Sequence, residues 1–175
     1  PATFELSAAK AQGERELAIR REAPSDWDPA NPDPFRSHGR AIHAILARVH
    51  TAKDLPGAMA KESAIWGLDP GTSAAIAMQL EALLKRSELQ PFFREGLEVH
   101  TETTLIDAQG KAVRPDRIVR DGDRFRILDI KTGAPSDHHQ EQVKGYVQLL
   151  QKVEAKPVDG FLLYMRDGAF TPVEA

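Results

Sequence analysis

A turn signal between two strand-like segments is the feature that most constrains the fold of this chain. Residues 113–133 read VRPDRIVRDGDRFRILDIKTG. Asp121-Gly122 is a preferred dipeptide for a two-residue turn that joins antiparallel strands. The segment therefore predicts a β-hairpin, with strands at about 112–120 and 124–131, that must pair within a larger sheet.

The turn also predicts which side chains of the hairpin share a face. With Asp121-Gly122 as the turn, Ile118 pairs with Phe125 and Asp116 pairs with Ile127. Asp116 and Asp129 are then diagonal neighbours on one face, roughly 7–8 Å apart. A slip of one residue would place the two acids on opposite faces of the sheet.

The triplet Asp129-Ile130-Lys131 places an acid and a lysine on the same strand face, because residues two apart point the same way. Such a pair is also typical of a solvated strand. Here the triplet lies in the apolar-flanked segment RILDIKTG, where charged side chains are harder to explain structurally. We therefore interpret the two acids and Lys131 as one reaction centre.

This set of residue types favours phosphodiester cleavage. Two carboxylates that bind Mg²⁺ or Mn²⁺ can lower the pKa of a bound water and neutralise charge on a phosphate. A nearby ammonium can orient that water or stabilise the transition state. Hard oxygen ligands suit these two metals, and the chain has no cysteine to indicate zinc or an iron–sulfur cluster.

Four ordered motifs resemble the PD-(D/E)xK nucleases, and specifically the RecB-like nuclease domain at the end of AddA-type and UvrD-like helicase-nucleases. That group carries G-x-x-x-H, G-x-x-D-R, D-Y-K-T-G and Q-x-x-x-Y in this order. The matching segments are Gly39 to His43, Asp116-Arg117, Asp129 to Gly133, and Gln142 to Tyr146. Together they extend over residues 39–146, which is most of the chain.

The resemblance implies a role for each matching residue. His43, Asp116, Asp129 and the backbone carbonyl of Ile130 would ligate the metal, and Lys131 would be the catalytic lysine. Gln142 and Tyr146, four apart on one helical face, would border the site and hold the DNA backbone or Lys131. Asp116, Asp129 and Lys131 form the expected catalytic set.

Two positions depart from the family pattern. Ile130 replaces the usual tyrosine, which matters little if only its carbonyl is used, and Val113 stands where a glycine is frequent. His43 also has a structural alternative, because it lies in an apolar helical pattern that suits a packing residue. Glu102 lies where the family often has an acid, but we interpret it as an edge-facing carboxylate.

The other histidines lack comparable support. We expect His138 and His139 to open the helix after the active-site strand and to be solvated; contact with phosphate is the alternative. His38 and His50 match no motif.

Composition limits the class of protein. The 175 residues can bury one sizeable core, and the formal net charge of −3 argues against a free-standing DNA binder. No apolar run approaches the roughly 20 residues needed to span a bilayer, and no secretory leader is visible. We expect a cytoplasmic, nucleoid-associated domain with no membrane partner.

We expect one nuclease domain over residues 1–175, excised from a longer helicase-nuclease because it begins at Pro1. Residues 1–36 read as an irregular lead-in, 37–90 as a helical portion and 91–175 as the catalytic core. No Walker phosphate-binding loop occurs, so an attached helicase module, and a partner subunit where one exists, would deliver the DNA.

The remaining elements predict an α/β fold. We expect helices from Ser37 to near Lys53, at about 58–66, from Asp69-Pro70 to about Ser87 with a core stripe, and from Ser136 or Asp137 to about Val153. A strand at about 97–106 precedes the hairpin, and a strand at 158–165 should join it in parallel beside 124–131. A further hairpin is expected around Asp167-Gly168. This αβββαβ order matches the restriction-endonuclease-like core that the resemblance implies, a central mixed sheet flanked by helices, with the N-terminal helical portion packed over it.

The sequence thus predicts a Mg²⁺- or Mn²⁺-dependent DNA exonuclease acting on single-stranded ends during double-strand-break processing and recombinational repair. Two alternatives stay open. The domain can instead be a non-catalytic DNA-binding or scaffolding part of a helicase complex, or a stand-alone endonuclease.

Overall fold

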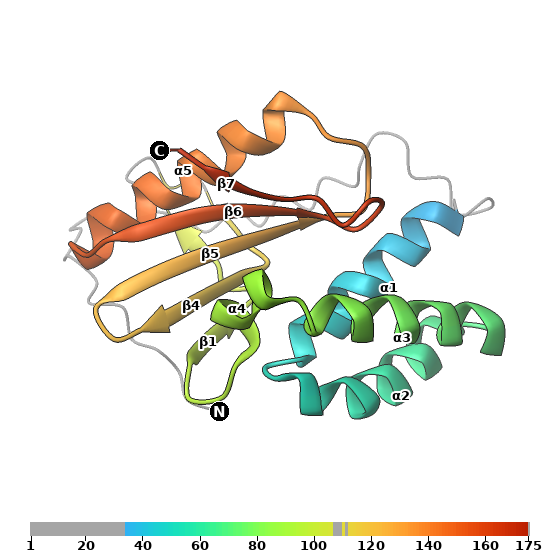
Figure 1. Cartoon of the computed structure of the whole chain (residues 1–175). Helices are drawn as coiled ribbons and strands as arrows, with labels where there is room; N and C mark the ends of the chain where they lie inside the picture. Colours follow the sequence, from blue (N-terminus) through green and yellow to red (C-terminus); the bar gives the residue numbers. More distant parts are fainter. Residues whose placement is uncertain (1–33, 107–109, 111, 175) are drawn as a thin grey trace, which may run out of the picture. The chain divides into compact units, whose positions relative to one another are not determined.

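A five-stranded mixed sheet forms the centre of the fold in the computed structural model, which describes residues 34–106, 110 and 112–174 (Figure 1). The strands run in the order β1-β4-β5-β6-β7. Their bounds are β1 Glu98–Thr101, β4 Arg117–Asp121, β5 Arg124–Lys131, β6 Val158–Tyr164 and β7 Phe170–Val173. The expected mixed sheet flanked by helices is confirmed.

Helices cover both faces of the sheet. They are α1 Pro34–Arg48, α2 Leu55–Trp66, α3 Pro70–Leu84, α4 Gln90–Phe93 and α5 Asp137–Glu154, with 3₁₀ turns at Ala52–Asp54 and Ser87–Leu89. Apolar residues of α1 to α4 share one core with Val119, Leu128 and Ile130 of the sheet. The opposite sheet face packs on α5. The expected packing of the N-terminal helices over the sheet is therefore confirmed.

Capping side chains fix where two of these helices begin. Asp69 accepts hydrogen bonds from the backbone N–H groups of Gly71 and Thr72, so α3 begins where the sequence predicts. Ser136 caps α5 in the same way through His138 N–H. The first helix begins at Pro34 rather than near Ser37. Residues 1–33 of the expected lead-in lie outside the described residues.

The hairpin turn is shifted by one position from the sequence prediction. Asp121 pairs with Arg124, so the two turn residues are Gly122 and Asp123. Gly122 has φ +62, and glycine at the first turn position with positive φ is typical of a type II′ turn. The expected Ile118–Phe125 pair is therefore wrong, because Ile118 lies opposite Ile127.

The shift changes the expected pairing of the two acids. The register moves by two residues, which leaves every side chain on its expected face. Arg117 pairs with Leu128, so extending the register by one residue places Asp116 opposite Asp129. On this extension the acids are direct cross-strand neighbours, whereas the sequence prediction made them diagonal.

Two of the expected strands are interrupted. The strand predicted at 97–106 divides into β1 and β2 Leu105–Ile106. Glu102 has φ +53, which no extended strand accommodates. The strand predicted at 112–120 likewise divides, and its first part, β3 Ala112–Val113, pairs with β2 in a separate two-stranded sheet.

The C-terminal half follows the prediction. Strand β6 lies parallel to β5, and β7 returns antiparallel to β6. A Cβ at Gly160 of β6 would lie 2.7 Å from side-chain carbons of Val143 and Val147, so this glycine lets α5 pack closely on the sheet. None of the described helices is long and apolar enough to cross a bilayer.

Candidate metal-dependent nuclease site

His43 on α1 and Asp116, just before β4, meet across 73 residues of sequence. His43 Nδ1 and Asp116 Oδ1 share a hydrogen bond of 3.1 Å. Burial disfavours the charged imidazole, but the hydrogen bond and charge of Asp116, with smaller effects from Asp129 and Glu102, raise the pKa of His43. The imidazole is therefore a member of the acidic site rather than a packing residue.

Asp116 also contacts the next strand. Its Oδ2 accepts a 2.6 Å hydrogen bond from the backbone N–H of Ile130 on β5. The Ile130 side chain packs in the core on the opposite face of the sheet. The two oxygens of Asp116 thus connect α1 to β5, and they hold the histidine next to the Asp129-Ile130-Lys131 triplet.

Asp129 is a buried acid whose surroundings disfavour its charge. The residue is 2% exposed. Burial, and then repulsion from Asp116, raises its pKa to about 6, although Lys131 and His43 act in the opposite direction. Lys131 Nζ lies 2.7 Å from Asp129 Oδ2, so the two side chains form an ion pair.

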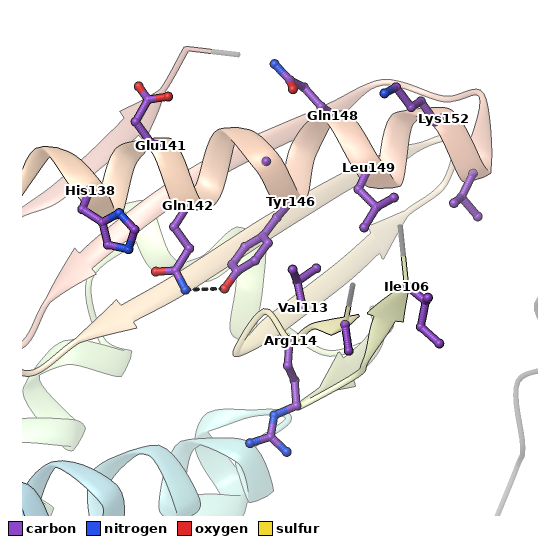
Figure 2. A pocket seen from close by; sticks show the side chains of 13 residues that line it. Ile106, Val113, Arg114, His138, Glu141, Gln142, Tyr146, Gln148, Leu149 and Lys152 are labelled. Carbon is purple, nitrogen blue, oxygen red and sulfur yellow. Dashed lines mark hydrogen bonds between the residues drawn. The ribbon is translucent and has the colours of Figure 1, made fainter. Parts of the chain in front are cut away.

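Lys131 is held by two side chains of α5. Its ammonium donates a 2.8 Å hydrogen bond to Gln142 Oε1, and Gln142 Nε2 donates a 2.6 Å hydrogen bond to the Tyr146 hydroxyl. Figure 2 shows the second of these bonds on α5. Burial, together with the charge of Asp129, raises the pKa of Tyr146 to about 12, so the hydroxyl stays neutral. The Gln142–Tyr146 pair thus orients Lys131 towards Asp129.

Glu102 lies in the site as well, contrary to our interpretation of it as an edge-facing carboxylate. Ligand atoms of His43, Glu102 and Asp116 all lie within 4.8 Å of one another. Arg114 Nε lies 2.9 Å from Glu102 Oε2 and anchors this side chain. The positive φ of Glu102 turns the chain out of β1 towards the site, and no sequence pattern predicts this bend. The signal that pointed to Glu102 was the acid that the family often has at this position.

The donor set fits a divalent cation. It offers one imidazole and hard carboxylate oxygens, and the three atoms of the His43, Glu102 and Asp116 group lie close enough to share an ion. Asp129 does not belong to that group, but its carboxylate is buried and is repelled by the charge of Asp116. A cation beside these acids would offset the repulsion that raises the pKa of Asp129.

The remaining histidines do not belong to the His43, Glu102 and Asp116 group. His139 is half-buried, and its Nδ1 lies 3.2 Å from the Tyr164 hydroxyl, so it is only partly solvated. His138 and His50 are exposed, and His38 is half-buried.

Gly39 sets how closely α1 approaches the end of β5. A Cβ at Gly39 would lie 2.7 Å from Thr132 Oγ1, and Thr132 directly follows Lys131. We expect Gly39→Ala to lower the rate of phosphodiester cleavage about tenfold. The new methyl group forces either α1, together with His43, to shift or the Thr132 side chain to change rotamer. Stability should change less, since the gain in helix propensity of about 1 kcal/mol offsets the overpacking of about 1–3 kcal/mol. Steady-state kinetics and thermal unfolding measure the two effects.

The double variant Gly39→Ala/Thr132→Ala is the control for this prediction. It removes the hydroxyl that the new methyl group would meet, so it should regain most of the lost rate. Equal rates in the single and double variants would contradict the proposed crowding.

The family model of the PD-(D/E)XK nuclease superfamily matches residues 2–172. The chain therefore belongs to this superfamily, and its fold is restriction-endonuclease-like. Membership indicates a nuclease, a phosphodiester hydrolase, in a superfamily whose enzymes use divalent metals. The candidate site supplies the matching His, Glu and Asp donors.

The other two comparisons add little. No curated protein matches the chain. Among solved structures, the chain is similar to one described as the crystal structure of SSO0001, with 21% identity and a TM-score of 0.34. That match covers 75% of this chain and 66% of the other, and we base no argument on it.

Proposed function

We propose that the chain is a Mg²⁺- or Mn²⁺-dependent deoxyribonuclease. The observation that supports this most directly is Asp116, whose two oxygens contact His43 and the backbone of Ile130. This bridge connects α1 and β5 through the residue just before β4, beside a buried acid and a lysine. Asp129 is 2% exposed, and the nearby charge of Asp116 repels it. Placing a second acid beside a buried one destabilises the fold, so a functional role explains the pair better than a structural one.

Four side chains and one carbonyl would hold the metal. They are His43, Asp116 and Asp129 with the carbonyl of Ile130, as the motifs imply, and Glu102, which the structure adds. The bound ion would supply charge neutralisation at the phosphate and a lower pKa for water. The protein's own contribution is to fix these ligands through the hydrogen bonds of Asp116.

Lys131 would act on the substrate directly. Hydrolysis joins a water oxygen to phosphorus and breaks a P–O bond, so negative charge grows on the phosphate oxygens. Two directions of the Lys131 ammonium are taken by Gln142 and Asp129. A third N–H is left to bind a phosphate oxygen or to orient the attacking water.

We further propose an exonuclease that degrades single-stranded DNA ends in helicase-coupled double-strand-break processing and recombinational repair. The four motifs support a RecB-like domain, whose helicase module would lie in the same chain and whose complex can include a partner subunit. The net charge of −3 gives the domain little attraction for DNA of its own. A motor that delivers the strand would compensate, in the cytoplasm beside the nucleoid.

The activity is tested with two substrates of different size. We expect the purified chain to hydrolyse bis(p-nitrophenyl) phosphate and labelled single-stranded DNA in Mn²⁺ or Mg²⁺, and to lose both activities in EDTA. Lys131→Met should lower both rates by about 10²–10³-fold, the range seen when a transition-state donor is removed. Lys61→Met is the matched control, because Lys61 is an exposed residue of α2.

The opposite result would favour the scaffolding alternative. It is a folded parent chain that binds Mn²⁺ and single-stranded DNA but hydrolyses neither substrate.

A further inference from the structure

An open groove adjoins the candidate site. It has a volume of about 920 Å³ and lies between α5 and the small β2–β3 sheet (Figure 2). Gln142 and Tyr146, the pair that holds Lys131, line one part of it. The groove therefore adjoins the proposed catalytic centre through these two side chains, and a chain bound there would lie next to the pair that holds Lys131.

Apolar side chains line much of this groove from both sides. Ile106 and Val113 come from the small sheet, and Leu149 and Val153 come from α5. Ile106 is 64% exposed and Val153 is 49% exposed. Exposed apolar side chains that gather on one concave surface are typical of a ligand site, because isolated ones need no such arrangement.

Polar groups lie beside the apolar surface. Two cations, Arg114 and Lys152, line the groove together with His138 and a single acid, Glu141. In Figure 2, Leu149 and Tyr146 of α5 point towards Val113, whereas Lys152 lies on the outer side of the helix. An apolar surface with cations around it suits a ligand that has flat apolar faces and a negatively charged backbone.

We propose that this groove binds the bases of a single DNA strand next to the phosphate that is cleaved. The inference deepens the proposed nuclease function and rests on it. Base faces are accessible only in a single strand, because a duplex stacks them inside and presents phosphates and base edges instead. The exposed apolar residues thus favour an unwound strand over a duplex.

The test removes apolar contacts without changing charge. In the double variant Ile106→Gln/Val153→Gln, we expect the KM for a single-stranded oligothymidylate to rise about tenfold, which corresponds to about 1.4 kcal/mol. Hydrolysis of bis(p-nitrophenyl) phosphate, which is too small to occupy the groove, should not change. Met78→Gln is the matched control, because Met78 is a 72% exposed apolar residue of α3.

The outcomes separate this inference from the proposed activity. If the double variant keeps the parent KM for the oligonucleotide, or loses cleavage of single strands and blunt duplexes equally, the groove does not bind bases. If the parent fails to hydrolyse even the small ester, the proposed function fails instead. Fluorescence anisotropy of the labelled oligonucleotide in Ca²⁺ then still decides whether the double variant binds more weakly.

Discussion

Asp129→Asn is expected to abolish hydrolysis and, at the same time, to make the metal-free protein more stable at neutral pH. The amide keeps the shape of the side chain but cannot supply a negative oxygen ligand, so the rate should fall about 10³-fold. Repulsion from Asp116 disappears with the charge, and so does the cost of burying it. Loss of activity together with a gain in stability indicates an acid that is kept for function. Replacing an acid that only forms a stabilising ion pair would lower the stability instead.

The pH dependence of stability follows from the same residue. Its pKa of about 6 lies above the ordinary value of 3.8, so the folded state holds this proton more tightly than the unfolded state. The resulting stability is fully present below about pH 4 and is lost as the pH rises through about 6. Two pKa units correspond to about 3 kcal/mol. Asp129→Asn should therefore keep this stability at pH 8.

Thermal unfolding of the metal-free protein between pH 4 and 8 measures this difference. The parent should lose stability across the range relative to Asp129→Asn, and Mn²⁺ should restore it in the parent alone. Asp123→Asn is the control, because that side chain is 94% exposed and pairs only with Lys156 among the described contacts. A variant less stable than the parent at pH 8 would show that the Lys131 ion pair outweighs the burial of the acid.

The faces of the active-site strands could be predicted from the sequence, because side chains alternate with a period of two. A register error of two residues leaves that alternation intact, so Asp116 and Asp129 lie on the expected face although the turn is at Gly122-Asp123. The parallel pairing of β5 with β6 was equally accessible, since a strand, a helix and another strand have one favoured arrangement.

The backbone breaks around the site could not be read from the sequence. Propensity favours one strand through 97–106, but the chain leaves β1 at Glu102 with φ +53, which no sequence pattern marks for a glutamate. Tertiary contacts explain the difference. The Glu102 carboxylate pairs with Arg114 and lies near His43 and Asp116, and these residues come together only after folding.

The motifs placed His43 in the site only by resemblance, since a histidine in an apolar helical pattern suits ordinary packing equally well. The physical reason for its position appears in the structure. Gly39 lets α1 approach Thr132, and Arg117 holds the other end of the helix. Both contacts, Gly39 with Thr132 and Arg117 with Val49, join residues far apart in the sequence, and local sequence patterns do not encode such contacts.

Arg117 is expected to be the most sensitive structural residue near the site. It is 2% exposed, and its guanidinium donates to three backbone carbonyls: Phe92, Val49 and His50, at 3.0, 2.8 and 2.9 Å. It also lies over the Phe93 ring, 4.1 Å from the centroid. Burial lowers the pKa of Arg117 to about 9, which leaves it charged at neutral pH. Arg117 thus connects the segment after α1 to β4 beside Asp116.

Replacing Arg117 by Met keeps an apolar stem but leaves three carbonyl acceptors without their donor. Each unsatisfied buried carbonyl lowers the free energy of unfolding by about 1–3 kcal/mol. Removing the buried charge of Arg117 offsets part of this loss, so we expect the free energy of unfolding to fall by about 3 kcal/mol in total. This corresponds to a fall of about 10 °C in Tm. Arg117→Lys should be nearly as unstable, since an ammonium keeps the charge but cannot supply the planar fork that reaches three carbonyls.

Mn²⁺ affinity distinguishes a role of Arg117 in positioning α1 from a general contribution to stability. Well below the Tm of the variants, Mn²⁺ affinity measured by calorimetry should fall about tenfold in Arg117→Met, because the end of α1 loosens and His43 moves away from Asp116. Arg124→Met is the control, since Arg124 forms an exposed ion pair with Asp159, and such pairs contribute about 0–1 kcal/mol. If Arg117→Lys has the Tm and the Mn²⁺ affinity of the parent, positive charge alone suffices at this position. The proposed role of the planar guanidinium in aligning the metal ligands is then wrong.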